Sequence, residues 1–144
     1  MRQPLELPPK VDFTYQPEQK ILIARTSGVL PISAWPRIMK LTLDEGRLHN
    51  CLRFLLDHRG ATFRLKFAEL WALPRNAGTF KYPEGARLAI LFPSPVRLQK
   101  EFIEAFNRNR GFDVKVFEDK ALATAWLLEP RPNILDFPSS QSQP

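Results

Sequence analysis

The sequence has few of the side chains on which catalysis and metal binding commonly depend. Its 144 residues include two histidines and one cysteine. A zinc site takes about four ligands at suitable spacing, and His49, Cys51, Asp57 and His58 do not offer that spacing. A nucleophilic Cys–His pair needs a supporting acid, and none is identifiable near His49. We therefore expect no enzymatic activity, no metal and no cofactor.

Long apolar runs and glycine-rich loops are also missing. No run approaches the roughly 20 residues of a membrane span, and residues 1–6 lack the apolar stretch of a secretory signal. The six glycines are isolated, so no phosphate-binding loop is present. The single cysteine, Cys51, has no partner for an internal disulfide, which is typical of a reducing compartment. We expect a cytoplasmic protein without a membrane span.

Positive charge exceeds negative charge, with 21 Lys and Arg against 15 Asp and Glu and a net charge of +6. Such a balance favours anionic partners. The basic residues are nevertheless spread along the whole chain, without a lysine-rich tail or a nucleic-acid-binding motif. Nucleic acid is therefore not the expected partner, and weak binding through the basic surface ranks third among the functions considered.

Apolar residues and prolines, in contrast, are plentiful. Hydrophobic residues make up 44% of the chain and include 11 Phe, and this length suffices for one buried core. Half of the 14 prolines lie near the two ends. We therefore expect an extended N-terminal segment over 1–10, one domain over 11–128 and a Pro/Ser/Gln-rich tail over 129–144.

Within the domain, apolar strands alternate with amphipathic helices, which predicts a mostly parallel sheet. An antiparallel hairpin comes first and is expected to end at Gly28. Ser33 is the expected N-cap of the first helix, and Trp35 begins its apolar stripe. Leu122 belongs to the apolar stripe expected for the fourth helix. The predicted strands cover 11–16, 20–27, 51–57, 86–92 and 113–118, and four helices are expected near 33–42, 64–73, 98–106 and 122–126.

The sequence Leu-Leu-Asp-His-Arg-Gly at 55–60 and three later segments, at 87–94, 114–119 and 123–127, carry a family resemblance. Their pattern of strand ends and helix starts resembles the STAS-like group, which is related to sporulation anti-sigma-factor antagonists and compared with lipid-carrying Sec14 domains. The resemblance implies a single-domain βα superhelix with five strands, used for binding. Residues 62–67 lack the Asp-Ser-Ser-Gly-like phosphoserine motif of the antagonists, so a phosphorylation switch is not implied.

Polar residues follow two neighbouring strands of this predicted sheet. The carboxyl ends of parallel strands meet at one edge, where ligands bind, and Ser94 stands at the start of a helix whose free N–H groups favour an anion. The expected ligand-binding residues are Asp57, His58, Arg59, Thr62, Ser94 and Arg97. Ordinary capping of a loop and a helix is the alternative interpretation of the same residues.

Together these observations predict a non-enzymatic, STAS-like binding or regulatory domain. It would act through a protein partner or a small anionic ligand, as a monomer or a homodimer. The alternative is a carrier of a lipid or another small apolar ligand, which the abundance of Phe and the likeness to Sec14 domains favour.

Overall fold

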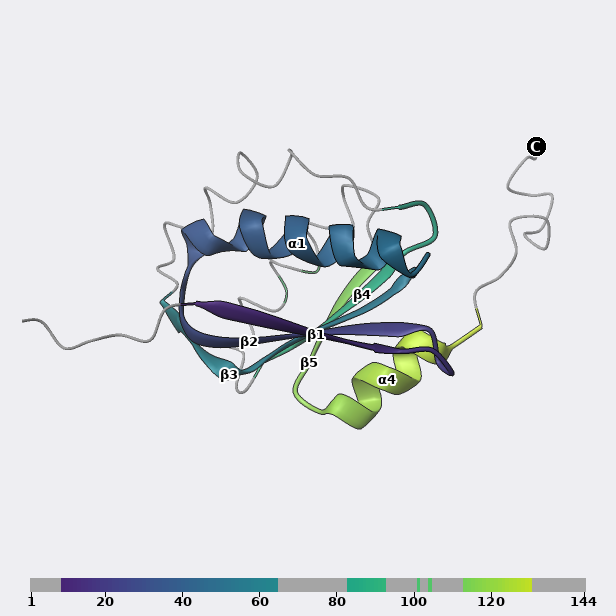
Figure 1. Ribbon diagram of the computed structural model, residues 1–144. Helices are drawn as coiled ribbons and strands as arrows, with labels where there is room; N and C mark the ends of the chain where they lie inside the picture. Colours follow the sequence, from purple (N-terminus) through teal and green to yellow (C-terminus); the bar gives the residue numbers. More distant parts are fainter. Residues whose placement is uncertain (1–8, 65–82, 93–100, 102–103, 105–112, 131–144) are drawn as a thin grey trace, which may run out of the picture.

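The computed structural model describes residues 9–64, 83–92, 101, 104 and 113–130 (Figure 1). Its strands pair in the order β1-β2-β3-β4-β5, with β1 antiparallel to β2 and the other neighbours parallel. This confirms the predicted mixed α/β sheet that an antiparallel hairpin opens. The elements are β1 (Lys10–Gln16), β2 (Ile21–Pro31), a 3-10 turn (Ile32–Ala34), α1 (Trp35–Leu48), β3 (Arg53–Arg64), β4 (Arg87–Leu91), β5 (Asp113–Phe117) and α4 (Lys120–Leu128).

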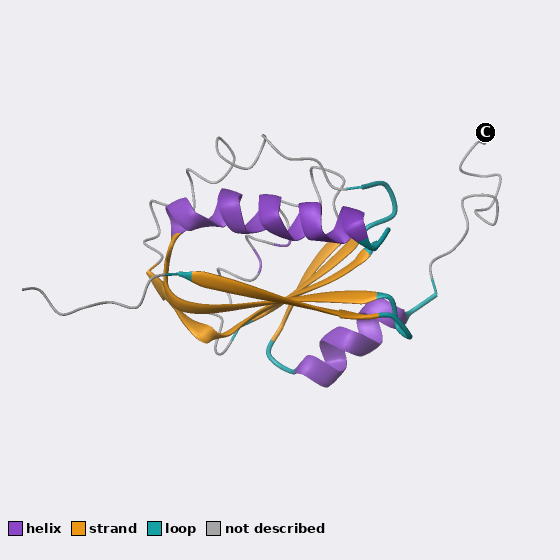
Figure 2. Cartoon of the chain, viewed as in Figure 1, coloured by secondary structure: helices purple, strands orange, loops and turns teal. Residues whose placement is uncertain are grey.

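The two described helices cover opposite faces of the sheet, as Figure 2 shows. Successive strand residues point to opposite faces, so Leu22 packs in a cluster with Met39 of α1, while Ile23 packs with Leu127 of α4. Burial on both faces explains why the central strands are continuous apolar runs rather than alternating ones. Neither helix is long and apolar enough to cross a membrane.

Helix α1 presents the predicted apolar stripe to the sheet, with Ile38, Met39 and Thr42 buried. The prediction of Ser33 as its N-cap was wrong. Ser33 lies within the preceding 3-10 turn, and the N-cap is Ala34, whose side chain makes no capping hydrogen bond. A proline in the first turn helps the helix to begin without a capping side chain, because proline's φ is preset and its missing N–H is not needed there.

Helix α4 begins at an effective cap. The Asp119 side chain accepts hydrogen bonds from the backbone N–H groups of Ala121 and Leu122, which satisfies donors left unpaired at a helix start. The helix buries Ala123 and Leu127, whereas Leu122 is 62% exposed. The predicted stripe through Leu122 was therefore wrong, because the buried face is rotated by about one residue.

Two strands are longer than the sequence predicted. β2 does not end at Gly28 but continues to Pro31, paired with β3 throughout, and this glycine adopts a φ of 83° that other residues rarely tolerate. β3 continues to Arg64, so a helix does not begin at that residue; the remainder of that predicted helix lies outside the described residues. Glu101 and Glu104, the described part of the third predicted helix, are helical. The described chain thus contains two of the four helices in full.

Candidate functional site

A β-bulge interrupts the parallel pairing of β2 with β3. Arg25 pairs with Asp57, but Ser27 pairs with Gly60, so His58 and Arg59 together stand opposite Thr26. A bulge leaves one residue out of the ladder and bends the strand, and bulges are frequent beside functional sites. This irregularity brings the polar residues of the predicted site onto the middle of β3 rather than its end.

Asp57 stabilises the bulge and binds the arginine that follows. Its carboxylate accepts the backbone N–H of Arg59 at 3.1 Å, the Arg59 Nε at 3.0 Å and the Arg59 Nη2 at 2.9 Å. The residue is only 5% exposed. Two parallel N–H···O bonds between a guanidinium and a carboxylate are a strong and geometrically specific contact. The Asp57 side chain therefore pairs a backbone N–H of the bulge and also fixes the guanidinium of Arg59.

Charge also acts on this carboxylate. Burial raises the pKa of Asp57, but the hydrogen bonds from Arg59 and the positive charges of Arg59 and Arg25 outweigh burial and hold the pKa below its usual value. In return, the hydrogen bonds that Arg59 donates to Asp57 and the negative charges of Asp57 and Asp119 raise the pKa of Arg59. The N-terminus of α4, which Asp119 caps, therefore lies within electrostatic reach of the site.

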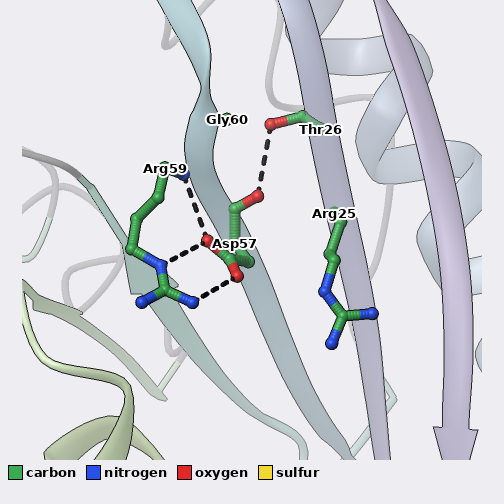
Figure 3. Close-up of a pocket in the computed structure, with 5 residues that line it drawn as sticks. All are labelled: Arg25, Thr26, Asp57, Arg59 and Gly60. Carbon is green, nitrogen blue, oxygen red and sulfur yellow. Dashed lines mark hydrogen bonds and ion pairs between the residues drawn. The ribbon is translucent and has the colours of Figure 1, made fainter.

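A cavity of about 340 Å³ opens beside this ion pair, as Figure 3 shows. The Arg25 and Arg59 side chains lie on either side of the Asp57 carboxylate, and both arginines are exposed. Gly60 permits a close approach of the strands, because a Cβ atom there would lie 3.2 Å from the Thr26 carbonyl oxygen. The cavity is lined by Arg25, Thr26, Asp57, Arg59 and Gly60.

His58, predicted to belong to the same site, faces the opposite side of the sheet. It is 0% exposed and lies between the rings of Trp35 and Phe92, at centroid distances of 5.5 and 5.4 Å. Its Nδ1 is 2.7 Å from the Thr26 hydroxyl. Burial lowers the pKa of His58 to about 3, despite the opposing charge of Asp57. His58 is therefore a neutral core residue that contacts the bulge from the face of the sheet that α1 covers.

The remaining predicted residues do not meet Asp57 in the described structure. Thr62 is exposed on β3, where it pairs with Val29, and it does not line the cavity. Ser94 and Arg97 lie outside the described residues. The structure therefore brings together two of the six predicted residues, Asp57 and Arg59.

Three residues of the cavity, Arg25, Thr26 and Gly60, were not predicted as site residues from the sequence. The signal available was a charged residue directly after the apolar run 21–24. Its position opposite Asp57 follows from the register of β2 against β3, which the sequence does not specify. The side chain of Arg25 also donates a hydrogen bond to Thr14 Oγ1 on β1 at 3.2 Å.

Other reactive side chains have structural contacts. His49 stacks on the ring of Tyr15 with a centroid distance of 4.1 Å. The Cys51 thiol donates to the carbonyl oxygens of Lys20 and Arg53, and burial raises its pKa, which disfavours the nucleophilic thiolate. Within the described ranges, no group of three or more His, Cys, Asp and Glu side chains is placed to hold a metal ion.

Comparison with solved structures identifies a similar protein from Shewanella loihica PV-4, described as an uncharacterized protein of the DUF3478 family with a SpoIIAA-like fold. The alignment covers 88% of this chain and 98% of that chain, with 20% sequence identity and a TM-score of 0.48. No protein-family model and no curated protein matches the sequence.

Proposed function

We propose that the chain is a non-enzymatic binding domain of the STAS-like type that recognises an acidic segment of a partner protein at the β2–β3 bulge. Arg25 and Arg59 would bind a carboxylate of that segment. The observation that carries the proposal is that two exposed arginines from adjacent strands flank one buried carboxylate beside a cavity.

The positive charges of Arg25 and Arg59 favour the binding of an anion. Asp57 binds Arg59 through Nε and Nη2, so the third guanidinium nitrogen of Arg59 takes no part in that contact. Arg25 acts on Asp57 through its charge and forms no ion pair with it among the described contacts. One carboxylate thus faces two positive charges, and Arg–carboxylate contacts at a partly desolvated site are specific as well as strong.

The test is a titration of the 15N-labelled full-length chain with a short Asp- and Glu-rich peptide, followed by NMR. We expect the amide signals of Arg25, Arg59 and Gly60 to shift together. Arg25→Gln should raise the Kd about five- to tenfold, as expected for the loss of one charge-assisted contact. The matched control is Arg37→Gln, which removes the same charge from an exposed position on α1.

Equal weakening by Arg25→Gln and Arg37→Gln would refute the proposal in favour of diffuse attraction to the basic surface. If inorganic phosphate shifts these amide signals and the peptide does not, the ligand of this site is a small anion rather than a protein segment. The lipid-carrier and nucleic-acid alternatives stay predictions from the sequence.

A further inference from the structure

A second cavity, of about 290 Å³, lies at the end of the sheet where β2, β3 and β4 begin. Lys20 and Arg25 are five positions apart in the chain, a distance of roughly 16 Å along an extended strand. The cavity is therefore distinct from the one at the bulge. Figure 1 shows α4 ending at the same end of the sheet as the β1–β2 turn. The lining residues are Lys20, Asn50, Leu52, Arg53, Gly85, Arg87 and Leu127.

Three of these lining residues are cations, and their charges are only partly balanced. Arg87 forms an ion pair with Asp113 at 3.1 Å. Arg53 donates to the uncharged carbonyl of Gln19 at 2.8 Å. Among the described residues, neither Arg53 nor Lys20 forms an ion pair with a carboxylate. The cavity therefore has an excess of positive charge that its own lining does not neutralise.

The position of Arg87 is fixed in detail. Its side chain is 10% exposed, and Nη1 donates to the carbonyl oxygens of Trp126 and Glu129 at 2.7 and 3.1 Å. Its guanidinium carbon lies 5.2 Å from the centre of the Trp126 ring. A cation held by an ion pair, two carbonyls and an aromatic face has little freedom left to lose when a ligand binds.

The backbone around this cavity is unusual too. Lys20 and Asn50 have φ angles of 57° and 51°, and they are the two non-glycine residues with positive φ in the described chain. Gly85, with φ 84°, lines the same cavity. Sparsely populated backbone conformations are frequent at ligand sites, and here Lys20 is itself one of the three cations, while Asn50 and Gly85 line the same cavity.

One part of the wall is apolar. Leu52 is 43% exposed, one of four large apolar side chains exposed in the described residues, and Leu127 of α4 lines the cavity with it. A ligand that suits this lining has an anionic head for the cations and a small apolar body for the leucines. The cavity volume of about 290 Å³ lies just below the roughly 300–1,000 Å³ typical of ligand cavities, which favours a short chain over a membrane lipid.

We propose that this cavity binds a small amphiphilic anion, with a carboxylate or phosphate head on Lys20, Arg53 and Arg87 and a short apolar chain against Leu52. Hexanoate and hexyl phosphate are the probes. They share the body and differ in the head, so comparison of their Kd values identifies which head is preferred. Acetate supplies the head alone, and hexanol supplies the body alone.

The experiment is an NMR titration of the full-length chain. We expect hexanoate or hexyl phosphate to shift the amide signals of Lys20, Leu52 and Gly85 at concentrations where acetate and hexanol shift none of them. Lys20→Gly should raise the Kd at least fivefold while the folded spectrum is retained, because glycine adopts a φ of 57° without strain. Lys10→Gln removes the same charge from β1 and should leave the Kd unchanged.

Leu52→Ser separates the two parts of the ligand, and we expect it to weaken hexanoate binding severalfold. Arg25→Gln, which tests the bulge cavity, should leave hexanoate binding unaffected, so the two sites succeed or fail separately. Equal weakening by Lys20→Gly and Lys10→Gln, or no localised shift with either amphiphile, would overturn the proposal. Equal binding of acetate and hexanoate would refute the apolar part.

Discussion

The buried histidine makes a quantitative prediction about stability in acid. His58 is 0% exposed, and burial lowers its pKa from 6.5 to about 3. The unfolded chain therefore binds a proton on this side chain between these two values, whereas the folded chain does not. Because the unfolded state binds more protons, the free energy of unfolding rises with pH across this window and falls as the solution is acidified.

The expected size follows from the same values. Acidification from about pH 7 to about pH 5 should cost about 2 kcal/mol of stability through His58, since each pH unit below the unfolded pKa corresponds to about 1.4 kcal/mol. Asp57 contributes little there, because its pKa lies below 3.8 in the folded chain. Its stabilising effect is present above its unfolded pKa and is lost only at lower pH.

Urea unfolding at the two pH values, followed by tryptophan fluorescence, measures this loss. We expect His58→Gln to be less stable than the wild type near neutral pH but to lose much less on acidification. His49→Gln, which changes the other histidine, should keep the full pH dependence. If His58→Gln does not fold, the ring signals of His58 in the wild type provide the test, because they should not titrate down to about pH 5. A titration midpoint near 6.5, or an equal loss of stability in the wild type and His58→Gln, would refute the argument.

Two substitutions test the packing of the helices on the sheet. Gly46→Ala should destabilise the protein by about 1–2 kcal/mol, because the new Cβ would lie 2.5 Å from a ring carbon of the buried Phe54. This overpacking outweighs the gain in helix propensity. Unchanged stability in chemical denaturation would contradict the prediction. Trp126→Ala should lower the free energy of unfolding by about 2 kcal/mol, which is less than the loss expected for a fully buried aromatic residue. The reason is that Trp126 is only partly buried against Phe117 and Arg87. A loss above about 4 kcal/mol would contradict this partial burial.

The sequence predicted the fold well where the apolar pattern is long. The runs 21–24 and 86–92 correspond to central strands because burial on both faces leaves no place for polar residues. The prediction from the sequence was wrong at residues 57–60, because the consecutive polar residues there resembled the end of a strand. Asp57 and His58 are tolerated within β3 because Arg59 and Thr26 satisfy them, and Thr26 is distant in the sequence.

The sequence predicted only those site residues that lie close to one another along the chain. Asp57 and Arg59 are two residues apart, and the sequence placed both at a ligand-binding edge. Arg25 was missed because its place opposite Asp57 depends on strand pairing across 32 positions. His58 was grouped with Asp57 in the predicted site, but consecutive strand residues point to opposite faces, and His58 packs against Trp35.

The extra residue in β3 also determines which changes of chain length the sheet can accept. Phe54, Leu56 and His58 alternate regularly on the α1 side, but the next residue that packs there is Ala61 rather than residue 60. Deletion of Gly60 would therefore restore an uninterrupted ladder and leave Ala61 on the side that it now occupies, since β2 already alternates without a break. Insertion of one residue would instead turn every later β3 side chain over. Deletion of one residue here would preserve the fold and remove the bulge, although Arg25 and Arg59 would both remain.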